Sequence, residues 1–195
     1  MIFRRRNTRR CRSHSYSGDG MYHLTLRSAV MENLFGMVTQ AGVVLNEYGR
    51  IAHEELLRTE QIRQELSILR FVIMPNHIHL LVVLKRSTDF SLSNSRTKVS
   101  GSAYNRRRST HSGTGPHPRS TAGPPPRSLG SFVAGYKSII TRRIREISGQ
   151  SGAVIWQRNY DDRIVRSHRM KQIVCGYIQR NPQREWIRLQ QHQIP

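Results

Sequence analysis

Two histidines separated by one apolar residue are the first candidates for chemistry in this sequence. His77 and His79 flank Ile78 in the apolar run from His77 to Leu84. In a strand, alternate side chains point to the same face, so both imidazoles would project together while Ile78 enters the opposite face. Two nitrogen donors at this spacing can chelate one divalent ion, and an apolar strand is a costly place for polar rings without partners. A pair of hydrogen-bonded sheet histidines would give the same pattern, so both interpretations stay open.

The segment CGYIQRNP near the end of the chain holds a second polar pair. Tyr177 and Asn181 are four residues apart and would share one face of a helix. A tyrosine hydroxyl can act as a nucleophile when its surroundings activate it. The same spacing also suits a half-buried aromatic ring and an asparagine that ends a helix before Pro182.

The charge of the chain indicates its partner. Lys and Arg number 32 against 12 acidic residues, a formal net charge of +20. Repulsion on this scale favours a polyanionic partner, so nucleic acid is the first to consider, with a basic structural protein as the alternative.

Cys11 and Cys175 form neither a disulfide framework nor a zinc pattern. The longest apolar run, Leu80 to Leu84, has the length of a strand and is too short for a membrane span. We therefore expect a cytoplasmic protein without membrane contact.

Hydrophobic periodicity predicts the elements that must position these residues. Strands are expected over Met21–Arg27, in a ribbon over Phe35–Leu45 broken at Gly42, over Phe71–Met74 and His77–Leu84 around a Pro75-Asn76 turn, and over Val154–Trp156 and Arg163–Val165. Helices are expected over Tyr48–Leu69, from a Ser131 cap to Ile147, and from near Ser167 to Arg180, stopped by Pro182. This order predicts an α+β fold of the split βαβ (ferredoxin-like) type, an antiparallel sheet with helices packed on one face, plus a C-terminal helix.

Composition divides the chain into four parts. Residues 1–18 form a basic arm, and residues 19–85 form the first part of the folded domain. Residues 86–129, rich in Ser, Thr, Arg, Gly and Pro, have little to bury and form an insertion. Residues 130–195 complete the domain.

Several strings together resemble one known family. FVIMPNHIHLLVVL, SFVAGYKSIITRRI, VIWQRNYDDRIVRS and YIQRNPQREW are similar to the REP-associated tyrosine transposases, a branch of the single-tyrosine HUH transposases, where HUH denotes His, hydrophobic, His. GMYHLTLRS, LFG and VVLNEYGRIA resemble the N-terminal half of the same family. The resemblance covers nearly the whole chain except the insertion.

The resemblance implies a site and a reaction. His77 and His79 would hold a divalent Mg²⁺ or Mn²⁺, Tyr177 would be the nucleophile, and Asn181 would fall where a third, polar metal ligand is expected. The implied activity is transposition by a metal-dependent single-strand DNA endonuclease and strand transferase that forms a 5′-phosphotyrosine link. The implied partner is single-stranded or hairpin-forming repeat DNA.

Further residues are candidates for holding the DNA. Cations could contact phosphates, and rings in GYKS and WQRNY could pack, shape the site or stack on bases. These candidates are Arg4, Arg5, Arg6, Lys137, Arg142, Arg143, Tyr136, Trp156 and Tyr160.

Two other functions remain open at this stage. One is a domesticated or decayed DNA-binding module that keeps the fold but does not cut. The other is a replication or conjugation initiator that uses the same HUH chemistry. The sequence does not decide between a monomer and a homodimer.

Overall fold

The computed structural model describes residues 14, 16, 18–29, 33–85 and 123–191. Its main sheet has four strands in the order β4-β5-β1-β6, and every neighbouring pair is antiparallel. The strands are β1 (Gly20–Arg27), β2 (Gly36–Thr39), β3 (Gly42–Leu45), β4 (Leu66–Met74), β5 (His77–Leu84) and β6 (Asp161–Ile164), and the helices are α1 (Glu47–Ile62), α2 (Leu129–Ser148) and α3 (His168–Gln191).

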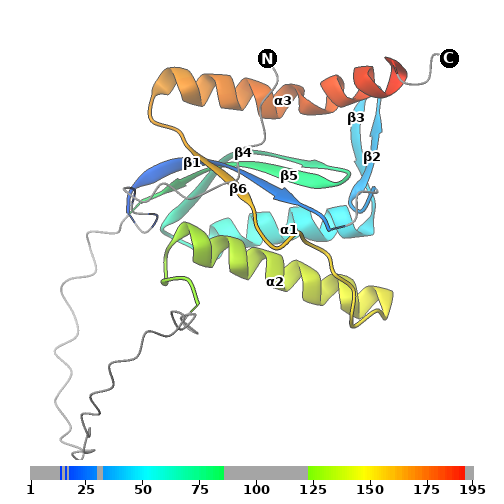
Figure 1. Ribbon diagram of the computed structural model, residues 1–195, viewed down its shortest axis with the longest axis horizontal. Helices are drawn as coiled ribbons and strands as arrows, with labels where there is room; N and C mark the ends of the chain where they lie inside the picture. The colour runs from blue at the N-terminus through cyan, green and yellow to red at the C-terminus, as the bar shows by residue number, and fades with distance from the viewer. Residues whose placement is uncertain (1–13, 15, 17, 30–32, 86–122, 192–195) are drawn as a thin grey trace, which may run out of the picture. The chain divides into compact units, whose positions relative to one another are not determined.

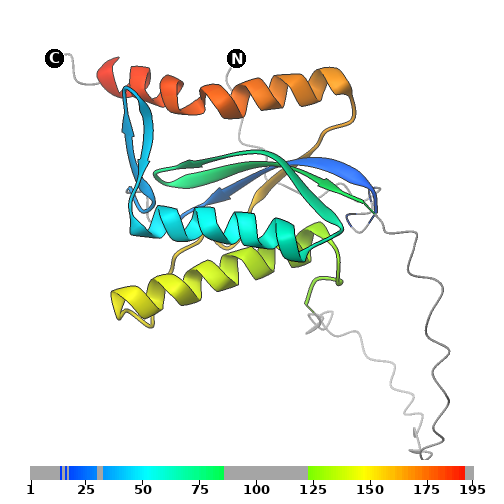
Figure 2. The same ribbon diagram turned by 180° about the vertical axis from the view of Figure 1, so that it is seen from behind.

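The two faces of this sheet are covered by different helices. α1 and α2 pack on one face, whereas α3 lies across the other (Figure 1). The view from behind shows the same layers (Figure 2). Even-numbered side chains of β1 and β5, such as Leu24 and Leu80, enter the larger core with α1 and α2. The smaller core is on the other face, where Leu81 packs with Val174 and Ile178 of α3. Because side chains alternate along a strand, His77 and His79 point to the α3 face.

Capping side chains fix where α1 and α2 begin. Asn46 caps α1, since its side chain accepts from the Gly49 amide at 2.9 Å. Ser128 caps α2 in a reciprocal capping box with Ser131, and Gly149 ends the helix in a left-handed conformation. Arg63, just after α1, donates to the carbonyl and hydroxyl oxygens of Ser131 and so ties α1 to the start of α2.

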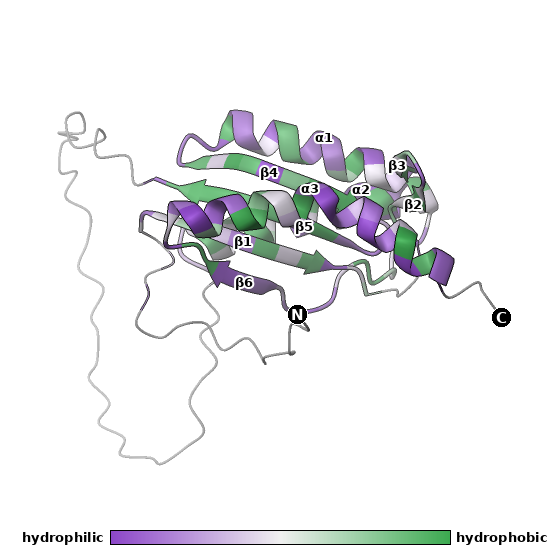
Figure 3. Ribbon diagram, turned by 90° about the horizontal axis from the view of Figure 1, so that it is seen from above, coloured by the Kyte–Doolittle hydropathy of each residue, from purple (hydrophilic) through white to green (hydrophobic). Residues whose placement is uncertain are grey.

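A separate two-stranded ribbon supports the far end of α3. β2 and β3 pair with each other and contact both α1 and α3. Figure 3 looks down onto α3, which lies over the strands and mixes hydrophilic with hydrophobic residues along its length. The tertiary contacts of its second half allow α3 to extend to Gln191.

The expected α+β architecture is confirmed, but three expected helix boundaries are wrong. The first helix ends at Ile62 because Leu66–Leu69, predicted as its last turn, belong to β4. Ser131 is the third residue of α2, and Ser128 is the cap. Pro182 lies inside α3 and does not stop it. The strand expected over Val154–Trp156 is only an isolated bridge between Trp156 and Ser28.

Other expectations concern the ends and the insertion. Residues 1–13 of the predicted arm, including Arg4, Arg5 and Arg6, and residues 86–122 of the predicted insertion lie outside the described residues. Leu129, the last residue assigned to the insertion, is the first residue of α2. Among the described residues, no helix is both long and apolar enough to cross a membrane.

Candidate active site

Residues from two distant parts of the chain meet on the α3 face of the sheet. The Tyr177 hydroxyl oxygen lies 3.4 Å from Nε2 of His79. The rings of His77 and His79 are 4.7 Å apart between centroids, and those of His79 and Tyr177 are 5.1 Å apart. The strand and helix that supply these residues therefore build one cluster.

Each predicted ligand histidine is held through its Nδ1 atom. The Nδ1–H of His77 donates to Oδ1 of Asn76 at 2.7 Å, because an amide oxygen can only accept. Nδ1 of His79 shares a hydrogen bond of 3.0 Å with the hydroxyl of Thr25, its register partner on β1. Such partners fix the orientation of an imidazole and direct its other nitrogen toward a ligand. Nε2 is therefore the atom that each ring can offer to a cation.

Burial keeps these imidazoles neutral. Desolvation, followed by the charge of Arg27, lowers the pKa of His77 to about 4, whereas Glu185 opposes this shift. His79 is 4% exposed, and burial together with the neighbouring histidines holds its pKa well below the usual value. Both rings carry a lone pair at neutral pH, which is the form that binds a metal.

A third histidine, absent from the sequence prediction, completes the aromatic cluster. The ring of His23 on β1 lies 5.2 Å from that of His79 and 5.8 Å from that of Tyr177. Its Nε2 is buried and has no hydrogen-bond partner among the described residues. Burial, and then the charge of Arg163, lowers the pKa of His23 to about 4. His23 follows the odd-numbered alternation of β1, which is the one sequence signal that placed it on this face.

α3 carries further polar residues beyond Tyr177. Asn181 is one turn further along and half-buried. Glu185, one turn beyond Asn181, is close enough to His77 to affect its pKa. The Arg184 guanidinium lies 5.7 Å from the centre of the Tyr177 ring, which places positive charge beside the candidate nucleophile.

The donor set fits a divalent cation of the kind expected. Two neutral imidazoles with Nδ1 already bonded, and an amide one turn from Tyr177, match a site of nitrogen and oxygen donors. Manganese accepts such a mixed set, whereas magnesium prefers oxygen donors. In the part of the chain that the structure describes, no group of three or more His, Cys, Asp or Glu side chains is arranged to hold a metal. A cation held here would therefore take any third ligand from another residue type, such as the Asn181 amide, or from water.

The candidate DNA contacts do not gather at this cluster. Tyr136 is 2% exposed, and its hydroxyl donates to the Ala52 carbonyl oxygen at 2.8 Å, so its ring packs in the core. Arg143 pairs with Glu54 and Glu55 of α1, both at 2.9 Å. Trp156 is buried against Phe35.

The remaining candidates lie near the outer surface of α2 or at the edge of the larger core. Lys137 donates to two backbone carbonyls, Arg142 is exposed, and Tyr160 is half-buried against the larger core.

Comparisons with known proteins agree with the fold. No protein-family model matches the chain. An uncharacterized protein of Haemophilus influenzae is 25% identical over 181 residues, covering 91% of this chain and 88% of that protein. The structure of a REP-associated tyrosine transposase bound to a REP hairpin superposes with a TM-score of 0.54 at 14% identity, covering 89% of this chain and 73% of that chain. A protein from Deinococcus radiodurans R1, provisionally described as a transposase, gives a TM-score of 0.42 at 16% identity over 88% of this chain and 96% of that chain.

The similarity to the REP-associated tyrosine transposase establishes a shared fold. The protein therefore has the fold of a REP-associated tyrosine transposase and carries, on one face of its sheet, a tyrosine hydroxyl beside a pair of histidines.

Proposed function

We propose that this protein is a transposase that cuts and joins single-stranded DNA through Tyr177, with a divalent cation as cofactor. The observation that carries the proposal is the 3.4 Å separation between the Tyr177 hydroxyl and Nε2 of His79, on elements far apart in sequence. The transposase that shares this fold is bound to a REP hairpin in its structure, which supports hairpin-forming DNA as the substrate class.

Tyr177 would attack the phosphorus of one DNA phosphodiester. A bond forms between its phenolic oxygen and phosphorus, and the bond from phosphorus to the 3′ oxygen breaks. The phenol loses its proton, and the departing 3′ oxygen gains one. The products are a 5′-phosphotyrosine link and a free 3′-hydroxyl. Since the new ester keeps the bond energy, attack by another 3′-hydroxyl restores a phosphodiester and frees Tyr177 without ATP.

The other residues of the cluster prepare this step. His77 and His79, held by Asn76 and Thr25, would bind the cation through Nε2, with Asn181 as a further ligand. When bound, the cation neutralises a non-bridging phosphate oxygen and so lowers the barrier to attack. Arg184 and Arg27 add positive charge, which favours the anionic substrate.

The histidine pair provides the direct test. His79→Ala should abolish cleavage of a hairpin with a single-stranded flank in Mn²⁺, while binding of the hairpin stays within about threefold, because phosphate contacts dominate affinity. His168→Ala, an exposed histidine at the start of α3, is the matched control and should cut at the wild-type rate. Cleavage by the wild-type protein in EDTA, or by the His79→Ala variant, would contradict the metal assignment.

A further inference from the structure

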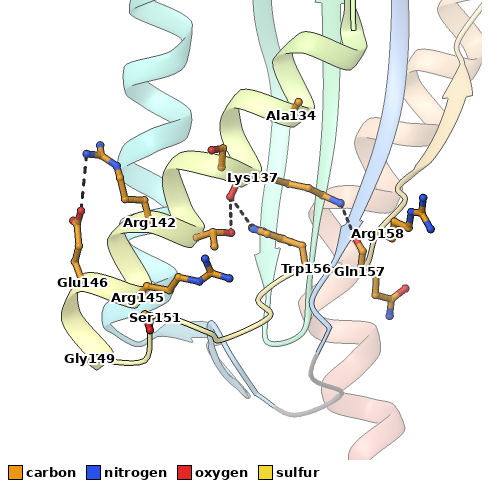
Figure 4. Close-up of a pocket in the computed structure, with 12 residues that line it drawn as sticks. Ala134, Lys137, Arg142, Arg145, Glu146, Gly149, Ser151, Trp156, Gln157 and Arg158 are labelled. Carbon is orange, nitrogen blue, oxygen red and sulfur yellow. Dashed lines mark hydrogen bonds and ion pairs between the residues drawn. The ribbon is translucent and has the colours of Figure 1, made fainter. Parts of the chain in front are cut away.

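A cationic hollow lies on the side of the molecule opposite the Tyr177 cluster. It has a volume of about 810 Å³ and lies between α2 and the segment that follows it (Figure 4). Of the described residues that line it, four are cationic, namely Lys137, Arg142, Arg145 and Arg158, and Glu146 is the one carboxylate. α2 packs on the face of the sheet that α3 does not cover, so this hollow is separate from the candidate active site.

The cations of the hollow are held in place without being neutralised. Arg145 donates from Nε and Nη2 to the Ala153 carbonyl oxygen, at 3.0 and 2.8 Å. The Lys137 ammonium donates to the carbonyl oxygens of Gln157 and Asn159, at 2.9 and 3.0 Å. A neutral carbonyl orients a cation but leaves its charge available, in contrast to the carboxylates that neutralise Arg143 elsewhere on α2.

Two more arginines are available to a ligand. Arg142 is exposed, and its contact with Glu146 is long, at 3.9 Å. Arg158 is exposed and makes no ion pair or hydrogen bond with the residues that the structure describes. Several cationic side chains that are already held in position in the hollow can contact successive phosphates of a nucleic acid backbone.

The hollow lacks the feature that unpaired bases require. Among the described residues that line the hollow, Trp156 is the one aromatic side chain, and it is 8% exposed with its indole N–H donated to the Lys137 carbonyl oxygen at 3.2 Å. Single strands are usually held by stacking bases on exposed rings, whereas a paired stem presents phosphates and hides its base faces. The lining therefore favours a base-paired stem over an unpaired strand.

The segment that lines the hollow after α2 leads into the sheet at β6. Arg158 lies three residues before β6, the edge strand of the sheet. Asp161, the first residue of β6, pairs in register with Thr25, which holds His79. DNA at the hollow would therefore lie on the face opposite Tyr177, beside the segment that leads into β6.

We infer that this hollow binds the phosphate backbone of the base-paired stem of the DNA substrate, an inference that rests on the proposed function. The exposed side chains of Arg142 and Arg158 would contact the phosphates directly. Lys137 and Arg145, which are held by backbone carbonyls, would add positive charge beneath them. Since phosphate contacts carry no sequence information, a stem of any sequence should bind there.

Binding measurements on two matched double variants test the inference. Arg142→Gln/Arg158→Gln removes two charges at the hollow, and Arg50→Gln/Arg58→Gln removes two exposed charges on α1, outside its lining. The probes are a blunt-ended DNA hairpin and an oligothymidylate of equal length, each titrated by fluorescence anisotropy at several salt concentrations. Thermal melting confirms that both variants are folded.

The hollow variant should bind the hairpin roughly tenfold more weakly than the α1 variant at physiological salt, with a salt slope reduced by about 2. Its affinity for oligothymidylate should match that of the α1 variant. Equal losses for the two variants, or an equal loss on both probes, would overturn the inference. Because no cleavage is measured, the result stands apart from the outcome for Tyr177 and the histidines.

Discussion

The hydroxyl of Tyr177 reaches the ring of His79 although 98 positions separate the two residues in the chain. Thr25 and Asn76 hold the two predicted ligand histidines through Nδ1, so the orientation of both rings is set without a cation. Sequence spacing was enough to predict that His77 and His79 share a face. It could not supply the Thr25 partner, because the register between β1 and β5 is a property of the folded sheet.

The position of His23 beside Tyr177 could not be predicted from any sequence motif. A lone histidine in an apolar strand has no diagnostic spacing, and its proximity to Tyr177 depends on where α3 crosses the sheet. The Nε2 of His23 is buried and unpaired among the residues that the structure describes. It should cost stability, since a buried polar atom without a partner loses its hydration.

The variant His23→Phe tests this cost. It keeps a ring beside Tyr177 and removes the unpaired nitrogen, so the free energy of unfolding should rise by about 1 kcal/mol at neutral pH without divalent ions. The pKa of His23 in the folded protein is about 4, below the usual 6.5, so acid protonates the unfolded chain first and stability falls as the pH drops through this window. The advantage of the variant should therefore grow by up to about 2 kcal/mol near pH 5. Urea denaturation at both pH values measures it, and an unchanged difference would contradict the assigned pKa.

At the scale of elements, local pattern and tertiary contact compete in two places. Leu66 and Leu69 continue the helical spacing of α1, but they join β4 because pairing with β5 buries an apolar strand. Pro182 removes one helical hydrogen bond, yet α3 continues because its second half packs against the β2–β3 ribbon. The sequence predicts that these elements exist, and packing decides where they end.

The contact between α1 and α2 can be tested at one hydrogen bond. Tyr136→Phe removes the buried donor to the Ala52 carbonyl oxygen and should lower the free energy of unfolding by about 1–2 kcal/mol. Tyr48→Phe, on a half-buried ring of α1, should change it by less than about 0.5 kcal/mol. Thermal denaturation compares the two, and equal losses would show that the hydroxyl of Tyr136 contributes nothing specific.

Across the whole molecule, a net charge of +20 predicts a polyanionic partner but no chemistry. The fold separates two features onto the two faces of the sheet. One face holds the Tyr177 cluster beneath α3, and the other carries the cationic hollow of α2. Composition could not predict this division, since the hollow arginines differ from Arg143 only in the partners that folding gives them.

The placement of Tyr177 predicts the form of DNA that is cut. Tyr177 is half-buried between α3 and the sheet, so a scissile phosphate must approach as an exposed strand. We expect cleavage of a single-stranded flank beside a hairpin, and at least about a hundredfold less on the same sequence in a perfect duplex. Gel analysis of labelled substrates in Mn²⁺ measures the ratio, and equal cutting of the duplex would contradict the proposed chemistry.

The central claim is that Tyr177 forms a covalent bond with DNA. The direct measurement is denaturing gel electrophoresis of the protein after incubation with labelled hairpin DNA and Mn²⁺. The wild-type protein and the Tyr160→Phe control should each give a DNA-linked band, whereas Tyr177→Phe should give none while still binding the hairpin. A DNA-linked band from Tyr177→Phe, or none from the wild-type protein, would contradict the account.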